Sequence, residues 1–186
     1  MADVRVGSAT DGRVPVSVAT RSLAAGPYQW VAMLLVALAA VAADQVTKAL
    51  VRSRLELYEA VDVTSWFQIH HVRNTGIAFG LFPGAASPVT ILTGIAVIWM
   101  IVYFTRAGSR SPFMPVAFGF LLGGSLSNLV DRVRQSYVTD FLDPTYWPAF
   151  NLGDVFITIG VIALVLIFVF GDRRPTVRRI SGPTLH

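Results

Sequence analysis

The feature that most constrains this chain is a series of four long apolar segments that carry no charge. They cover 22–43, 88–105, 112–130 and 155–170. About 20 residues of α-helix, rising 1.5 Å each, cross a hydrocarbon core about 30 Å thick. With 54% hydrophobic and only 14% charged residues, the chain is too apolar for an ordinary soluble domain. The sequence therefore predicts an all-α integral membrane protein with four transmembrane helices.

A second kind of pattern occupies the connection between the first two apolar segments. Residues 55–72 are rich in β-branched and aromatic side chains with imperfect alternation, which predicts short strands outside the membrane. His70 and His71 are adjacent there, so on a strand they would point to opposite faces. No further ligand stands at metal-site spacing, and the chain has no cysteine. We therefore expect a small β-rich subdomain inserted at about 55–80, and no metal site.

The first apolar segment has two interpretations. Arg21, the apolar run and the small residues at 40–42 together imitate a cleaved signal peptide. Three further apolar segments follow, however, and the leader that contains Arg21 is long. We therefore expect this segment to stay in the protein as its first transmembrane helix.

The charges are distributed unevenly between the two sides that four spans define. The termini and the 106–110 loop carry nine of the fifteen Lys and Arg residues, but only three of the eleven acids. Because positive loops remain inside, both termini are expected in the cytoplasm and the β-rich insertion outside. The basic residues gather at chain ends and in loops instead of along a stripe with aromatics, so nucleic-acid binding is not expected.

The connection between the third and fourth apolar segments, 138–154, carries three carboxylates. Asp154 adjoins the apolar run 155–170, where an ionised carboxylate is costly, and a second carboxylate such as Asp140 could share its proton and activate water. The simpler alternative is that Asp154 caps a helix and Asp140 lies in a solvated loop. Asp143 precedes Pro144, and we expect it in a solvated turn.

Other polar residues accompany the expected extracytoplasmic ends of the helices. Asp44 and Lys48 are four residues apart, so on a continuing helix they share a face and can pair. On the third apolar segment, Gly119, Gly123 and Ser127 repeat at four-residue spacing, which lets two membrane helices approach closely. The polar groups that follow them, Asn128, Asp131 and Arg132, must face protein or water.

Five short motifs occur in order along these segments. They are Asp44-Gln45-x-x-Lys48, Asn74-x-Gly76-x-Ala78-Phe79, Gly123-Gly124-x-x-x-Asn128-x-x-Asp131-Arg132, Val138-x-Asp140-Phe141 and Phe150-Asn151-x-x-Asp154. Together they resemble the lipoprotein signal peptidase family, also called signal peptidase II. That family consists of bacterial aspartic proteases of the inner membrane with four helices and a small extracytoplasmic β-cradle. Its members remove the signal peptide of diacylglyceryl-modified prolipoproteins just before the lipidated cysteine.

The resemblance implies a role for each residue that matches a motif. Asp140 and Asp154 would be the catalytic pair, without any cofactor or metal. Supporting or substrate-binding roles would belong to Asp44, Lys48, Asn74, Gly76, Asn128, Asp131, Arg132 and Asn151. Which aspartate carries the shared proton stays open, because a coupled pair titrates as a unit.

The resemblance also suggests a domain organisation and partners. We expect a disordered cytoplasmic tail at 1–25, a four-helix membrane peptidase domain at 26–171 and a basic cytoplasmic tail at 172–186. The partners would be a lipid-modified prolipoprotein and the phospholipids of the bacterial cytoplasmic membrane, and the protein would be a monomer. The alternative function is a proton-coupled small membrane transporter, although transporters usually place their carboxylates near the midplane.

Two positions depart from the family's usual motifs. Gly153 stands where the family usually has Ala, and Ser127 stands where it usually has Gly. Both exchanges keep a small side chain. We expect them to alter local helix flexibility without changing the assignment.

Overall fold

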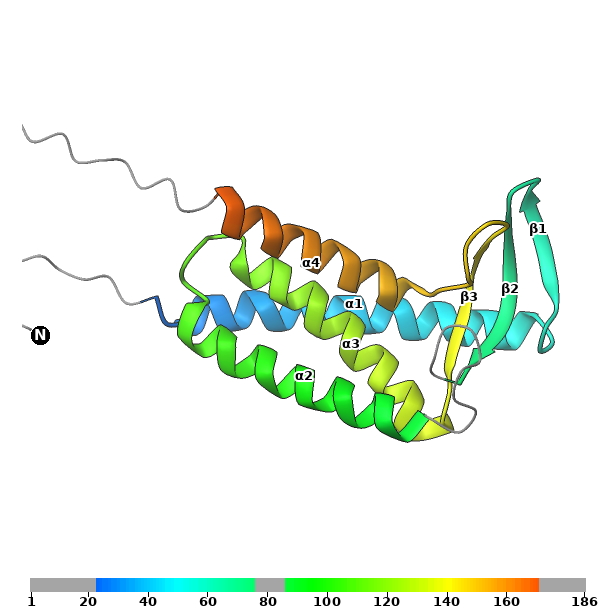
Figure 1. Ribbon diagram of the computed structural model, residues 1–186, viewed down its shortest axis with the longest axis horizontal. Coiled ribbons are helices and arrows are strands. Elements are labelled where there is room, and N and C mark those ends of the chain that lie inside the picture. Colours follow the sequence, from blue (N-terminus) through cyan, green and yellow to red (C-terminus); the bar gives the residue numbers. More distant parts are fainter. Residues whose placement is uncertain (1–22, 76–85, 171–186) are drawn as a thin grey trace, which may run out of the picture.

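The computed structural model describes residues 23–75 and 86–170, which form four helices and three strands. The elements in chain order are α1 (Pro27–Arg54), β1 (Ala60–Thr64), β2 (Phe67–Asn74), α2 (Ala86–Ala107), α3 (Met114–Gln135), β3 (Val138–Pro144) and α4 (Leu152–Phe170). The helices lie side by side, and the sheet crosses one end of the bundle (Figure 1).

The helix α3 is the centre of the bundle, because it packs against α1, α2 and α4. Its contact with α1 uses two glycines of the small-residue repeat. A Cβ on Gly123 would lie 2.7 Å from the Ala37 carbonyl oxygen, and one on Gly119 would lie 2.6 Å from Val36 Cβ. The expected close approach of two helices through small residues is therefore present, between α1 and α3.

Three of the described helices are long and apolar enough to cross a membrane: α1, α2 over Pro88–Ala107, and α4. The third expected span also forms a helix, α3, but it does not meet the same criterion of apolarity. Its last two turns carry Asp131, Arg132 and Arg134, and much of its surface is covered by the other helices. A helix enclosed by others needs fewer apolar residues than one that faces lipid.

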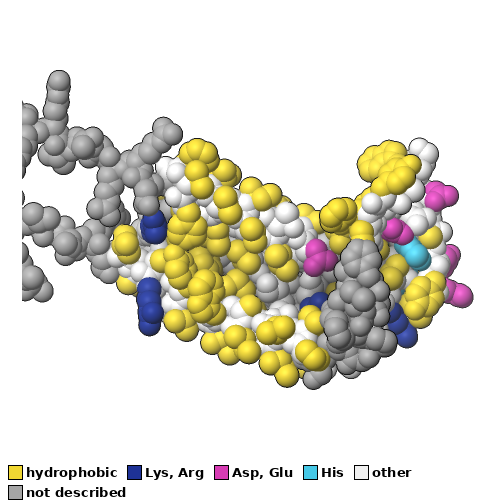
Figure 2. Space-filling model, viewed as in Figure 1, with side chains coloured by type: hydrophobic (Ala, Val, Ile, Leu, Met, Phe, Trp, Pro, Cys, Tyr) yellow, Lys and Arg dark blue, Asp and Glu magenta, His cyan; other side chains and the backbone are white. Residues whose placement is uncertain are grey.

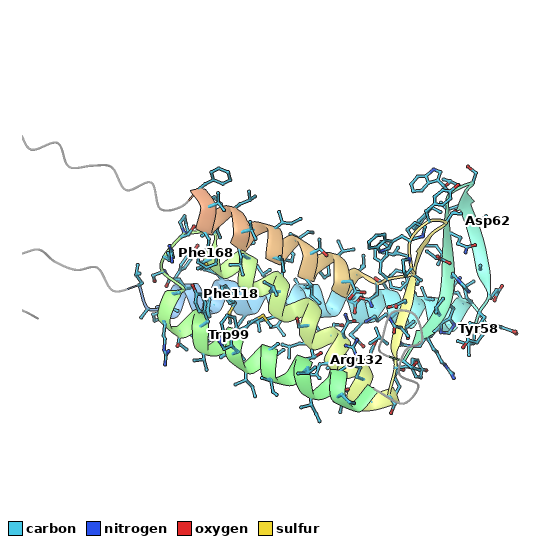
Figure 3. All side chains as sticks on the ribbon, in the orientation of Figure 1. Tyr58, Asp62, Trp99, Phe118, Arg132 and Phe168 are labelled. Carbon is cyan, nitrogen blue, oxygen red and sulfur yellow. The ribbon has the colours of Figure 1, made fainter. Side chains whose placement is uncertain are left out.

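Aromatic side chains fill the end of the bundle that is remote from the sheet (Figure 3). Tyr103 on α2 stacks on Trp99 and on Phe118 of α3, with ring centroids 5.6 and 5.9 Å apart. Phe168 of α4 meets Tyr103 edge to face at 6.4 Å. This aromatic cluster fixes the three helices to one another, because such pairs contribute about 0.5–1.5 kcal/mol beyond their buried area.

The sheet is antiparallel, with strand order β1-β2-β3. The hairpin of β1 and β2 confirms the strands expected at 55–72. The third strand was not expected, because the sequence analysis treated 138–154 as a connection. It pairs with β2 through Val72 opposite Asp140 and Asn74 opposite Val138. The β-rich part is therefore assembled from two insertions, and one of them carries Asp140.

The surface of the helices agrees with a lipid environment. Hydrophobic side chains cover the bundle in the space-filling view, whereas acidic side chains gather at the end that carries the sheet (Figure 2). Large apolar side chains such as Leu35, Leu38 and Trp99 are more than half exposed. Exposed apolar area of this extent marks contact with lipid or another protein.

The helix α1 differs from its expected bounds. It begins at Pro27 and continues to Arg54, beyond the expected end at residue 43, so Asp44 and Lys48 lie within it. The expected tails at 1–25 and 172–186 lie outside the described residues, apart from 23–25.

The packing of α1 on α3 yields a stability prediction. Replacing Gly123 by Val should lower the free energy of unfolding by about 1–3 kcal/mol, because the new side chain would collide with the α1 backbone. Gly94 on α2 is a matched control: a Cβ there meets nothing within 4 Å, so Gly94→Ala should not destabilise. Thermal unfolding in detergent would measure both variants, and equal stability of the two would contradict this description of the helix contact.

Candidate active site

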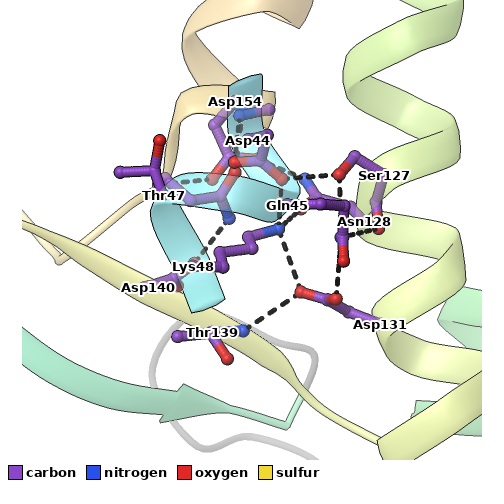
Figure 4. Close-up of polar contacts among 12 residues, drawn as sticks. Asp44, Gln45, Thr47, Lys48, Ser127, Asn128, Asp131, Thr139, Asp140 and Asp154 are labelled. Atoms are coloured by element: carbon purple, nitrogen blue, oxygen red, sulfur yellow. Dashed lines mark hydrogen bonds and ion pairs between the residues drawn. The ribbon is translucent and has the colours of Figure 1, made fainter. Parts of the chain in front are cut away.

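Two elements bring the expected catalytic carboxylates together at the sheet end of the bundle. Asp140 lies in the middle of β3, and Asp154 lies in the first turn of α4. Both carboxylates accept hydrogen bonds from Asn151. The labelled residues around them come from α1, α3, β3 and α4, as the close-up of their contacts shows (Figure 4).

Asn151 connects the two carboxylates directly. Its backbone N–H donates to Asp154 Oδ2 at 3.2 Å, and its side-chain Oδ1 accepts from the Asp154 N–H at 3.1 Å. This reciprocal pair is a capping box at the start of α4, with Asn151 as the N-cap. The amide group of the same side chain donates to Asp140 Oδ1 at 2.7 Å. One residue therefore positions both aspartates.

Asp140 is almost fully enclosed and receives two amide hydrogen bonds. Asn151 donates to Oδ1, and Asn74, at the end of β2, donates from Nδ2 to Oδ2 at 2.9 Å. Burial raises the pKa of Asp140 to about 6, while both amide donors favour the ionised form and lower it. A carboxyl group with a pKa near 6 can take up and release a proton close to neutral pH. The expectation of a solvated loop residue is therefore excluded for Asp140.

Asp154 is held from the side of α3. Asn128 donates from Nδ2 to Asp154 Oδ1 at 2.9 Å. The other end of this amide, Oδ1, accepts a hydrogen bond from Lys48 Nζ at 2.8 Å. Because the ammonium group can only donate, it forces the Asn128 amide to present its NH2 group to Asp154.

Lys48 is completely buried and contacts two further carboxylates. Its Nζ lies 2.6 Å from Asp44 Oδ2 and 3.0 Å from Asp131 Oδ2. The expected Asp44–Lys48 pair is therefore confirmed, but it is an interior ion pair and not an exposed one. Removing one partner from such a pair costs about 3–5 kcal/mol, because the other charge stays buried without compensation.

Asp44 also fixes the start of α4, and it contacts both positions that depart from the family's usual motifs. Its Oδ1 accepts from the Gly153 N–H at 2.8 Å, and its Oδ2 accepts from Ser127 Oγ at 2.6 Å. A Cβ on Gly153 would lie 2.8 Å from Asn151 Oδ1, so glycine suits the crowded contact. The hydroxyl of Ser127 adds a donor that glycine would lack.

Three residues of this network were missed as site residues: Gln45, Thr139 and Ser127, whose contact with Asp44 is given above. Gln45 donates from Nε2 to Ser127 Oγ and to Asp131 Oδ1, both at 2.9 Å. The Thr139 N–H, next to Asp140 on β3, donates to Asp131 Oδ2 at 3.4 Å. Gln45 belongs to the first motif, so the sequence did indicate that it could be a site residue. No sequence pattern indicated that Thr139 would be one. Through these bonds Asp131 connects α1, α3 and β3.

Arg132 lies at the sheet end of α3 (Figure 3). Its positive charge lies near enough to Asp154, Asp140 and Asp131 to interact with their carboxylates. Nη1 donates to its own helix at the Asn128 carbonyl, 3.5 Å away, and Nε has no hydrogen-bond partner among the described residues. The guanidinium therefore has a donor available beside both aspartates.

Asp143 does not lie in a solvated turn, as the sequence analysis expected. It belongs to β3, and its Oδ2 receives hydrogen bonds at 2.7 Å from Gln68 Nε2 and from His70 Nδ1. The sequence Asp143-Pro144 correctly indicated a break in regular structure, which is the end of β3, but it did not indicate that Asp143 belongs to a strand. Because Asp143 follows Asp140 by three positions, the two side chains point to opposite faces of β3.

Most expected site residues are thus connected through hydrogen bonds. Asp44, Lys48, Asn74, Asn128, Asp131, Asn151 and both aspartates form one continuous network, with Arg132 beside it. Gly76 lies outside the described residues. Among the described residues, no group of three or more His, Cys, Asp or Glu side chains could hold a metal ion.

Comparison with known sequences assigns the chain to a family. A family profile described as "Signal peptidase (SPase) II" matches residues 36–170, which is more than half of the chain. The chain belongs to the signal peptidase II family. The resemblance inferred from the five motifs is therefore confirmed.

Individual relatives of the signal peptidase II family agree with this assignment. The lipoprotein signal peptidase of Symbiobacterium thermophilum is 34% identical over 148 residues, which cover 77% of this chain and 97% of the relative. That of Syntrophotalea carbinolica is 38% identical over 142 residues, covering 72% and 88%. A bacterial membrane enzyme solved by the in meso method at 2.3 Å resolution superposes with a TM-score of 0.71. It is 29% identical, with 80% of this chain and 93% of that chain covered.

The hydrogen bond between Asn74 and Asp140 yields a prediction on acidity. Replacing Asn74 by Leu removes a donor that stabilises the ionised carboxylate, so the pKa of Asp140 should rise above about 6. Infrared titration of the carboxyl C=O band would measure it, with Asp140→Asn as the control in which this band disappears. A lower pKa in Asn74→Leu would show that the donor does not act on the ionised form.

Proposed function

We propose that this protein is an aspartic endopeptidase that removes the signal peptide from diacylglyceryl-modified prolipoproteins. Cleavage would occur just before the lipidated cysteine, with Asp140 and Asp154 as the catalytic pair. The single observation that carries the proposal is the shared fixation of both carboxylates by Asn151. Membership of the signal peptidase II family supports the substrate class.

The chemistry follows from two carboxylates that share one proton. The ionised aspartate accepts a proton from a water molecule, whose oxygen attacks the carbonyl carbon of the peptide bond. The protonated aspartate donates to the carbonyl oxygen, so that a neutral tetrahedral intermediate forms. Its collapse breaks the C–N bond while a proton passes to the leaving amine. The raised pKa of Asp140 supports a proton exchange of this kind near neutral pH.

The surrounding polar groups suit this mechanism in two ways. The amides of Asn74, Asn128 and Asn151 fix the carboxylates so that little reorganisation accompanies the proton transfers. The buried Nε–H of Arg132 has no hydrogen-bond partner within 23–75 and 86–170, and it would be a donor for a backbone carbonyl of the substrate. Lys48 acts indirectly on the proposed catalytic pair, because its ammonium group contacts Asn128, Asp44 and Asp131 rather than Asp140 or Asp154.

The proposal includes a placement in the bacterial cytoplasmic membrane. In it, α3 would be a fourth transmembrane helix that tolerates polar residues because α1, α2 and α4 surround it. Both termini would be cytoplasmic, and the sheet with Asp140 would lie outside, consistent with the distribution of Lys and Arg. The protein would act as a monomer. A site at the end of the bundle can receive a lipid-anchored cysteine whose acyl chains remain in the bilayer.

The alternative of a proton-coupled transporter is not favoured. Transport sites usually lie near the midplane between broken helices. Here both carboxylates lie at the sheet end, and the described parts of the helices are continuous over their stated bounds.

The catalytic pair is tested by three parallel substitutions. Asp140→Asn and Asp154→Asn should each lower kcat/KM on a lipidated, cysteine-containing peptide by about 10²- to 10⁴-fold, because amides cannot exchange the proton. Asp143→Asn is the matched control and should keep most of its activity, since Asp143 points to the other face of β3. EDTA should leave the turnover of the unaltered enzyme unchanged.

Thermal unfolding of the three variants would separate lost chemistry from lost folding. Near-normal turnover in Asp140→Asn or Asp154→Asn would exclude that residue from the pair. Activity that survives in Asp140→Asn but disappears in Asp143→Asn would transfer the role to Asp143.

The proposed orientation has its own test. Reporter fusions at Gly108, between α2 and α3, should show a cytoplasmic location, and fusions at Glu59, before β1, should show an extracytoplasmic one. Alkaline phosphatase and green fluorescent protein fusions would measure the two sides. The opposite pattern would refute the orientation.

A further inference from the structure

The sheet has an apolar face that extends away from the proposed catalytic pair. On β3, Asp140 and Leu142 are two positions apart and therefore share a face. Leu142 pairs with Ile69 of β2, which pairs with Val61 of β1, so these side chains form a row on that face. Val61 is about half exposed. The face of the sheet that carries Asp140 thus continues toward β1 as an apolar surface. No described residue is known to cover this surface.

The opposite face of the sheet is polar toward the hairpin, whereas Thr139 and Phe141 on the same face of β3 are buried. The neighbouring row consists of Asp62, Gln68 and Asp143, in register across the three strands. His70 joins it through its bond to Asp143. A sheet with one apolar and one polar face separates two environments. The polar row is suited to water, so the apolar face must meet something else.

The geometry shows which way the apolar face is turned. Asp140 lies on this face and contacts Asn151 at the start of α4, so the face is directed toward the helices. The strands run across the end of the bundle, and the β1–β2 hairpin extends sideways beyond α4 (Figure 1). In the space-filling view the outline is hollowed between α4 and the tip of the hairpin (Figure 2).

Exposed aromatic residues stand at this overhanging tip. Trp66 in the β1–β2 turn is 60% exposed, and Tyr146 and Trp147 in the loop before α4 are 92% and 69% exposed. The Thr145 N–H donates to the Trp66 carbonyl at 3.0 Å, so the two loops form one unit. No charged residue lies between Pro144 and Leu152, where α4 begins. The aromatic tip is therefore continuous with the apolar surface of a membrane-crossing helix.

We propose that this tip, formed by Trp66, Tyr146 and Trp147, lies in the headgroup interface of the bilayer together with the apolar face of the sheet. Trp and Tyr are enriched at that depth because their rings are apolar at one end and polar at the other. The occupant of the hollow is lipid, in contact with α4. The protein would thus contact the membrane through the sheet as well as through the helices. This additional contact fixes the depth of Asp140 relative to the bilayer surface.

A direct test uses the fluorescence of the two tip tryptophans. In a Trp30→Phe/Trp99→Phe variant, the remaining tryptophans are Trp66 and Trp147. Reconstituted in phosphatidylcholine vesicles, their emission should be quenched more strongly by bromine near the headgroup than by bromine near the end of the acyl chain. Emission that no brominated lipid quenches would overturn the proposal. This measurement needs no enzymatic activity.

A second test compares two environments and relies on the proposed function. Replacing Trp66 and Trp147 together by Ser should lower kcat/KM on a lipidated peptide about tenfold in phosphatidylcholine vesicles, because the apolar anchor is lost. The same variant should keep its activity in detergent micelles, which adapt to the protein. The control is Asp62→Ser on the polar face, which should behave like the unaltered protein in both.

The outcomes distinguish the two proposals. An equal loss in vesicles and in micelles would assign the apolar face to the peptide substrate and overturn the lipid contact. No loss in vesicles would overturn it as well. If the unaltered protein failed to cleave the peptide but the tip tryptophans were quenched, the proposed function would be wrong and the interfacial contact would stand.

Discussion

The ammonium group of Lys48 is completely buried in the bundle, and the polar architecture around it compensates for this one charge. Asp44, Asp131 and Asn128 all direct oxygen atoms at its Nζ, and they come from α1 and α3. Each of these partners has a second bond that leads outward. Asp44 binds the first turn of α4, Asn128 binds Asp154, and Asp131 binds the backbone of β3. A single buried cation thereby relates three helices and one strand to one another.

The sequence predicted those parts of the fold whose signal is local. Charge-free segments of sufficient length identified the helices, and the small-residue repeat indicated a close helix contact, whose partner α1 only the structure shows. The strand β3 was missed because its residues Val138–Pro144 contain two aspartates and a proline, which resemble a loop. The strand β3 forms because it pairs with β2, which lies more than sixty residues earlier in the chain. A pairing between such distant segments cannot be predicted from the residues of β3 alone.

The candidate site was predictable as a set of residues but not as an arrangement. The motifs identified Asp140, Asp154 and Asn151, and the structure places them in one network. The sequence could not show that Asn151 makes three hydrogen bonds, two with Asp154 and one with Asp140. The bond to Asp140 forms only when β3 meets the start of α4. Asp143 was misplaced for the same reason: its partners Gln68 and His70 lie on a different strand.

The capping box at the start of α4 links the position of Asp154 to the winding of a helix. Asp154 receives its fixed position only when the first turn of α4 is closed around Asn151, and that turn is held in place by Asp44 from α1. A newly synthesised chain whose first and last described helices had not yet met would therefore lack a positioned acid, even with every residue already made. The polar network around Asp140 and Asp154 is therefore complete only when the bundle is complete.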